Sequence, residues 1–89
     1  GPDHPSVAEQ LNSLALLLQL TDRAAEAEPI CRRAAKIFLD STARTGQQHP
    51  SLTVALGNYA SIIRKLGVDD CEVRSRLNAM LEEYGMSLG

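Results

Sequence analysis

The sequence has few of the residues that build an aromatic core or a covalent framework. Its 89 residues contain no tryptophan and only three other aromatic side chains, Phe38, Tyr59 and Tyr84. The two cysteines, Cys31 and Cys71, are too few for a disulfide framework and do not follow a metal-ligand spacing. A chain of this length forms one domain at most. We therefore expect a single domain over residues 1–89 with an aliphatic, alanine-rich core.

Strong charge and long apolar runs are also missing. The formal net charge of −2 provides no basic field, which argues against nucleic-acid binding. The longest unbroken apolar run, Leu14 to Leu18, is far too short to span a membrane. No signal peptide is visible, so we expect a cytoplasmic chain that binds neither nucleic acid nor membrane. The absence of an initiator methionine predicts that it is a piece of a longer protein.

No pattern in the chain predicts catalysis, a cofactor or a metal. The two histidines, His4 and His49, lack further ligands at a compatible spacing, so we expect both to be loop or helix-entry residues. The sequence contains no glycine-rich phosphate loop. Its carboxylates are scattered, and no local nucleophile and base are paired. We therefore expect a protein that is not an enzyme.

The clearest pattern is a pair of amphipathic helices. The first apolar stripe has the helical spacing i, i+3, i+4, i+7 and consists of Leu11, Leu14, Ala15 and Leu18. A second stripe with helical spacing consists of Ala27, Ile30, Cys31, Ala34 and Phe38. Between them, Thr21 and Asp22 are typical helix-entry residues. The pattern predicts an αα-hairpin with helices over 5–20 and 24–42, and Pro29 requires that the second helix either starts late or bends.

These residues resemble the tetratricopeptide repeat. The match lies in Leu11-x-x-Leu14-Ala15-x-x-Leu18 with the later Ala27 and Ala34, and it extends from residue 1 to about residue 67. The sequences His4-Pro5 and Ala27-Glu28-Pro29 are similar to the kinesin light chain type of this repeat. Cys31 stands where that type usually has a large aromatic side chain, which implies a thinner packing layer. Gly1-Pro2 suits either a cloning remnant or the family's inter-repeat linker, and we favour the linker.

The start of the pattern returns later in the chain. His49-Pro50-Ser51 repeats His4-Pro5-Ser6 after 45 residues, which is longer than the ~34 residues of the ordinary tetratricopeptide repeat. The stripe of the first helix is reproduced by Leu56, Tyr59, Ala60 and Ile63. The spacing predicts a helix over 50–66, the first helix of a second repeat. Gly57 in this helix destabilises it by about 1 kcal/mol relative to alanine.

The last predicted helix departs from the repeat. Asp69-x-x-Glu72 is a capping box, and it predicts a helix over 69–84 that lacks the Ala-Glu-Pro sequence. Repeat arrays need such a polar terminal helix, so we expect the C-terminal end of an array. The predicted fold class is all-α, a right-handed TPR-like superhelix of about four helices whose last helix is a cap. Its exposed N-terminal face is expected to favour a homodimer.

The resemblance also implies a binding surface. In this family the first helix of each pair lines the concave side of the solenoid. Asparagine amides suit a peptide backbone, and Arg64 and Lys65 suit a carboxylate. Carried over by position, the candidate partner-binding residues are Glu9, Asn12, Ser13, Leu16, Gln19, Val54, Gly57, Asn58, Ser61, Arg64 and Lys65.

Three functions follow from this interpretation. The leading one is a protein–protein interaction scaffold that binds a peptide or partner segment on the concave face. The second is a structural C-terminal cap that mediates self-association. The third is a regulatory arm of a larger signalling protein.

Overall fold

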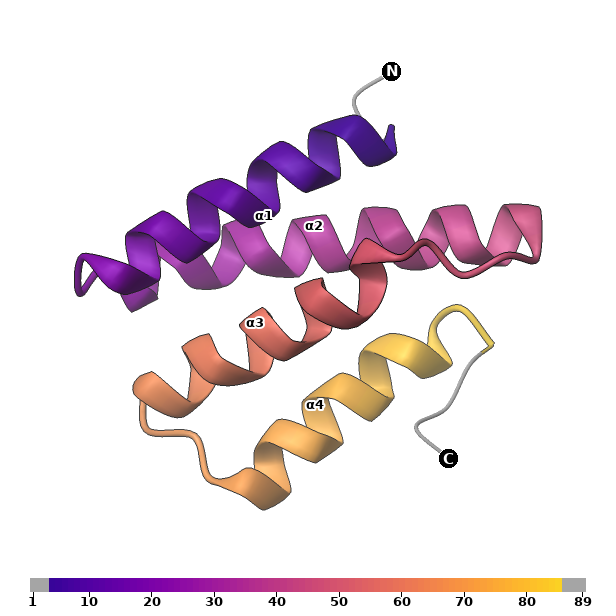
Figure 1. Ribbon diagram of the computed structural model, residues 1–89. Coiled ribbons are helices and arrows are strands. Elements are labelled where there is room, and N and C mark those ends of the chain that lie inside the picture. The colour runs from indigo at the N-terminus through magenta and orange to yellow at the C-terminus, as the bar shows by residue number, and fades with distance from the viewer. Residues whose placement is uncertain (1–3, 86–89) are drawn as a thin grey trace.

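The computed structural model describes residues 4–85, and over this range it contains four helices and no strand. They are α1 (Pro5–Leu20), α2 (Ala24–Thr45), α3 (Ser51–Lys65) and α4 (Asp70–Glu82) (Figure 1). The predicted all-α class is therefore confirmed. The predicted linker, with Gly1-Pro2, lies almost wholly outside the described residues.

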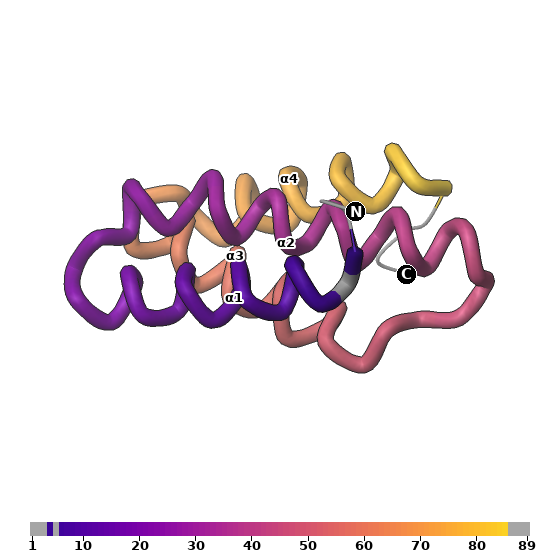
Figure 2. Tube along the Cα trace, turned by 90° about the horizontal axis from the view of Figure 1, so that it is seen from above, coloured from indigo at the N-terminus to yellow at the C-terminus, as the bar shows by residue number. Residues whose placement is uncertain are grey.

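The four helices form two layers. Seen from above in Figure 2, α1 and α3 lie on one side and α2 and α4 on the other. The most extensive packing joins α1 to α2 and α2 to α3, and α3 also packs against α4. α1 therefore lies at one edge of the molecule, with no other helix beyond it in Figure 1.

Both histidines lie at the start of a helix and accept a backbone N–H there, as the sequence predicted for helix-entry residues. His4 Nδ1 accepts a hydrogen bond from the backbone N–H of Ser6, and His49 Nδ1 accepts one from Ser51, each at 3.1 Å. Both imidazoles must therefore carry their proton on Nε2. The ring of His49 also packs against Phe38, with 4.7 Å between the ring centroids.

The α1–α2 turn differs from the prediction. The Thr21 hydroxyl donates to the carbonyls of Leu17 and Leu18, both at 3.1 Å, so this residue ends α1 and does not begin α2. Asp22 takes a left-handed conformation with φ of 61° that reverses the chain. Arg23 occupies the N-cap of α2 without a side-chain cap, and its guanidinium pairs with Glu26 in the first turn.

The predicted end of α2 at residue 42 is also wrong. The helix continues to Thr45, with Arg44 paired to Asp40 one turn earlier at 3.0 Å, and Gly46, with φ of 74°, ends it. α2 is continuous from Ala24 through Pro29, which excludes the late start. α3 and α4 each lie within one or two residues of the predicted bounds.

The start of α4 forms half of the predicted capping box. Asp69 Oδ1 accepts from the backbone N–H of Glu72 at 2.8 Å, which satisfies one free N–H of the first turn. The Glu72 carboxylate accepts instead from Arg76 Nε at 3.2 Å, so it does not return to Asp69.

Small side chains bring the helices close together in the core. The fully buried alanines are Ala8, Ala15, Ala27, Ala34, Ala35 and Ala55. Phe38, Leu39, Ile62 and Ile63 fill the larger spaces. Such alanines let helix axes approach closely, as the sequence pattern predicted.

The two cysteines are free and differ in their surroundings. Cys71 is exposed, whereas Cys31 is buried and its thiol donates to the carbonyl of Ala55 at 3.5 Å. Burial, with a smaller contribution from the Glu28 carboxylate, raises the pKa of Cys31 to about 12. Cys31 is thus a small, inert part of the core.

Candidate functional site

A row of polar side chains joins α1 to α3, and we call it the polar seam. Asn58 Nδ2 donates to Asn12 Oδ1 at 3.2 Å, and Gln19 Nε2 donates to Ser61 Oγ at 2.6 Å. Lys65 Nζ donates to the backbone carbonyl of Gln19 at 3.4 Å. The structure therefore brings these five predicted site residues together, but it pairs them with one another.

Gln19 is the most buried member of the polar seam. Only 7% of it is exposed, which makes it the one buried polar residue between positions 4 and 85. The sequence reading placed Gln19 on an open surface because the apolar stripe of α1 does not include it. In the structure α3 lies along this side of α1, so the amide is covered and needs its hydrogen bond to Ser61.

Glu9 and Arg64 lie at opposite ends of the predicted surface. Glu9 is exposed, and its carboxylate accepts from the Ser51 hydroxyl at 3.4 Å, next to the start of α3. Arg64 Nε donates to Asp70 Oδ1 at 2.8 Å. This pair bridges the α3–α4 turn, so the structure places Arg64 away from the polar seam.

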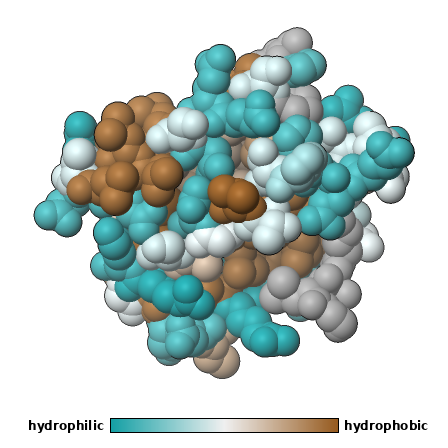
Figure 3. Space-filling view, viewed as in Figure 1, coloured by the Kyte–Doolittle hydropathy of each residue, from teal (hydrophilic) through white to brown (hydrophobic). Residues whose placement is uncertain are grey.

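Large apolar side chains flank the polar seam and face solvent. Leu16 and Leu20 of α1 and Val54 of α3 are all exposed. Figure 3 views the layer of α1 and α3 and shows apolar side chains gathered over the C-terminal end of α1. We call the surface formed by Leu16, Leu20, Val54 and the polar seam the α1–α3 face.

Gly57 leaves space on the α1–α3 face. It is exposed, and a Cβ built at this position meets no atom within 4 Å. Ser13 is exposed on the α1 side. The face carries little charge, because Glu9 is the single charged residue of α1.

A second apolar surface lies at the outer edge of α1. The sequence placed Leu14 in the packing stripe, but 44% of it is exposed, and 58% of Leu17 is exposed. The residues 45 positions later, Tyr59 and Ile62, are 3% and 0% exposed. The prediction for Leu14 is wrong because the stripe of one helix does not reveal whether a neighbour is present to cover it.

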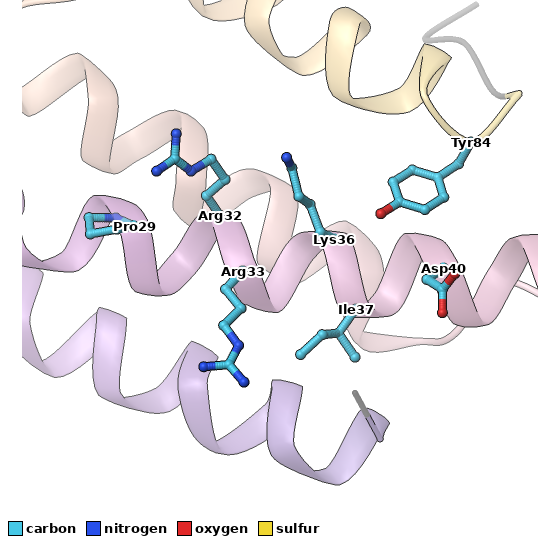
Figure 4. Close-up of a pocket in the computed structure, with 7 residues that line it drawn as sticks. All are labelled: Pro29, Arg32, Arg33, Lys36, Ile37, Asp40 and Tyr84. Carbon is cyan, nitrogen blue, oxygen red and sulfur yellow. The ribbon is translucent and has the colours of Figure 1, made fainter. Parts of the chain in front are cut away.

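A basic cluster on α2, formed by Arg32, Arg33 and Lys36, borders a shallow cavity of about 530 Å³. In Figure 4, Arg32 and Lys36 point toward α4, whereas Arg33 and Ile37 point toward α1. Glu28 pairs with Arg32 at 3.6 Å and Glu83 with Lys36 at 3.7 Å. The cations therefore diverge and are partly neutralised, which suits a solvated surface better than an anion site.

Within residues 4–85, no three His, Cys, Asp or Glu side chains gather as a metal site. None of the helices described is both long and apolar enough to cross a bilayer.

Burial, with the neighbouring Glu28 carboxylate, raises the pKa of Tyr59, so this phenol stays neutral.

Comparison with known proteins finds no matching family model, no matching curated protein and no matching solved structure. The function of the chain must therefore be argued from its surfaces. Of these, the α1–α3 face combines exposed apolar side chains with a rigid polar framework.

Proposed function

We propose that this chain is a protein-interaction module that binds a segment of another protein across the α1–α3 face. The observation that carries the proposal is the exposure of Leu16, Leu20 and Val54 on one face of a well-packed fold. Single exposed apolar residues are ordinary, but several gathered on one face mark a site where another protein packs.

The repeat architecture supports the same function. α1 and α3 share one layer, and each follows a histidine whose Nδ1 accepts a backbone N–H at the start of the helix. This arrangement fits a TPR-like solenoid, in which the first helices form an extended binding surface. We include the TPR-like superhelix, with α4 as its last helix, in the proposal.

The polar seam defines what the partner must offer. Asn12 and Asn58 already bond to each other, so their amides hold the two helices in register. Binding energy must come mainly from apolar contacts with the leucines. The fitting partner is a segment with apolar side chains on one face, and an acidic group near Lys65 would add a charged contact.

The test is a selection of binding peptides with matched variants. A displayed library of 16-residue peptides is selected against the native chain, and the binders are titrated against Leu16→Glu and Leu66→Glu. Leu66 is exposed to the same degree but lies at the α3–α4 turn. We expect Leu16→Glu to weaken binding at least tenfold and Leu66→Glu to leave it unchanged. Binders that are insensitive to Leu16→Glu would rule out the α1–α3 face.

A structural cap is the second candidate function, and the outer surface of α4 favours it. Glu72, Arg76, Glu82 and Glu83 of this region are exposed, and Arg76 pairs with Glu72. A polar terminal helix of this kind closes a stack of helices. Light scattering from a chain with Ser75→Leu would show whether an apolar α4 surface promotes aggregation, as this role requires, and an unchanged mass would count against it.

A further inference from the structure

The outer surface of α1 has an internal counterpart that is covered. We define the end face as Gln10, Leu14 and Leu17, and the residues 45 positions later are Ala55, Tyr59 and Ile62. On α3 these residues are buried, and α2 lies against them, because the Cys31 thiol contacts Ala55 and Tyr59 lies beside Glu28. The end face therefore corresponds to a surface that a helix covers, but no helix within residues 4–85 covers it.

We propose that a second copy of this chain covers the end face, with α1 packed against α1 of the partner around a twofold axis. In such an isologous pair, each end face contacts the identical surface of the other copy. Leu14 and Leu17 of both copies would then form one apolar contact between two helices.

Charge supports self-pairing at α1. A twofold contact brings identical residues together, so a charged surface would repel itself. α1 has a single charged residue, Glu9, and its sequence from Gln10 to Leu20 has none. The end face is thus neutral throughout.

The other surfaces of the chain do not accept the end face in a head-to-tail arrangement. α2 already packs on both α1 and α3, so its apolar stripe is occupied. The exposed surface of α4 carries Glu72, Arg74 and Arg76. Covering these charges with leucines would cost desolvation energy, and the leucines would offer them no new polar contact in return. A closed dimer is therefore favoured over an open chain of copies.

The size of α1 limits the strength of the pair. A helix of 16 residues is about 24 Å long. One face of such a helix is smaller than the ~800 Å² per partner of a standard interface. The dimer should therefore dissociate on dilution.

The first experiment measures mass by sedimentation velocity over a concentration range up to millimolar. We expect a concentration-dependent monomer–dimer equilibrium that Leu17→Lys abolishes and Val54→Lys leaves intact. Val54 is a matched control because it is similarly exposed on the α1–α3 face. A monomer at every concentration, or an equal loss with both variants, would overturn the proposal.

The second experiment tests the twofold axis. In a Cys71→Ser background, Leu14→Cys or Leu17→Cys is oxidised with a mild disulfide-forming reagent. We expect a covalent dimer from at least one variant, because the axis brings the residue close to its own copy, and none from a Ser75→Cys control on α4. A head-to-tail contact would hold the introduced thiol of each copy away from that of the other, so the lack of a covalent dimer from both variants would overturn the twofold arrangement. Because peptide binding is scored with Leu16→Glu and dimerisation with Leu17→Lys, failure of either proposal is distinguishable from failure of the other.

Discussion

α1 and α3 start with the same His-Pro-Ser sequence and have similar lengths, 16 and 15 residues, yet they bury different faces. α3 lies between α2 and α4 and buries Tyr59 and Ile62. α1 packs on α2 and contacts α3 through the polar seam. Leu14 and Leu17, which correspond to Tyr59 and Ile62, remain exposed to solvent. The comparison shows that an apolar stripe indicates which side of a helix can be buried, whereas the neighbouring helices determine whether that side is buried.

The largest contrast should come from trimming equivalent side chains. We expect Ile62→Ala to lower the free energy of unfolding by about 3 kcal/mol, because it leaves a cavity in a closed core. Leu17→Ala should change it by less than about 0.5 kcal/mol, because the side chain already faces water. Urea unfolding at low protein concentration measures both. Similar losses for the two variants would show that α1 is covered in solution.

Breaking the polar seam should have the next largest effect. We expect Gln19→Ala to destabilise the fold by about 1.5 kcal/mol, since the amide is buried and bonded to Ser61. A double-mutant cycle with Ser61→Ala should give a coupling of about 1 kcal/mol. As a control, Ser13→Ala on the exposed side of α1 should be neutral. Additive effects of Gln19→Ala and Ser61→Ala would mean that the bond does not hold α1 to α3.

The fold should lose stability in alkaline solution, because burial between α2 and α3 raises the pKa of Cys31 to about 12 from its ordinary value of 9.0. Below pH 9 the thiol is neutral in both the folded and the unfolded chain, and its full contribution to the free energy of unfolding is present. Between pH 9 and pH 12 only the unfolded chain ionises, so stability falls by about 1 kcal/mol at pH 10. Unfolding at pH 8 and pH 10 should show this loss in the native chain and a smaller one in Cys31→Ala. Equal losses would place the pH dependence elsewhere.

The smallest contrast should be the difference in stability lost when His4 or His49 is substituted. Changing either histidine to alanine should lower the stability of its helix by about 1 kcal/mol. His49→Ala should cost more than His4→Ala, because His49 is half-buried and its ring also packs on Phe38. Thermal unfolding of the two single variants gives the order. If His4→Ala were the more destabilising, the packing of His49 on Phe38 would contribute little to stability.

The sequence was sufficient for the four helices and for the start signals of α1, α3 and α4. It was not sufficient for the start of α2, because Thr21 ends α1 and Asp22 reverses the chain. Helical spacing predicted α1, and the His-Pro-Ser repeat predicted the start of α3, because periodicity and caps are local properties. It did not predict the end of α2, where residues 43–45 continue the helix as far as the left-handed Gly46.

The surface was less predictable than the helices. Sequence reasoning treated Gln19 and Asn12 as free for a partner, since a single stripe does not show that α3 lies alongside. It also treated Leu14 as core. Its burial depends on whether another helix covers this side of α1, and a single apolar stripe does not show that. Arg64 pairs across the next turn with Asp70, a contact that depends on the geometry of the chain reversal.

The charges of the molecule are distributed unevenly along the stack, and this has a consequence for its response to solvent. Within residues 4–85 no ion pair involves α1, whereas Lys36–Glu83 ties α2 to the end of α4. Apolar contacts weaken on cooling, because their heat-capacity signature makes them strongest at higher temperature. Exposed ion pairs weaken as added salt screens them. Cold should therefore loosen the α1 end of the molecule first, and salt should loosen the α4 end.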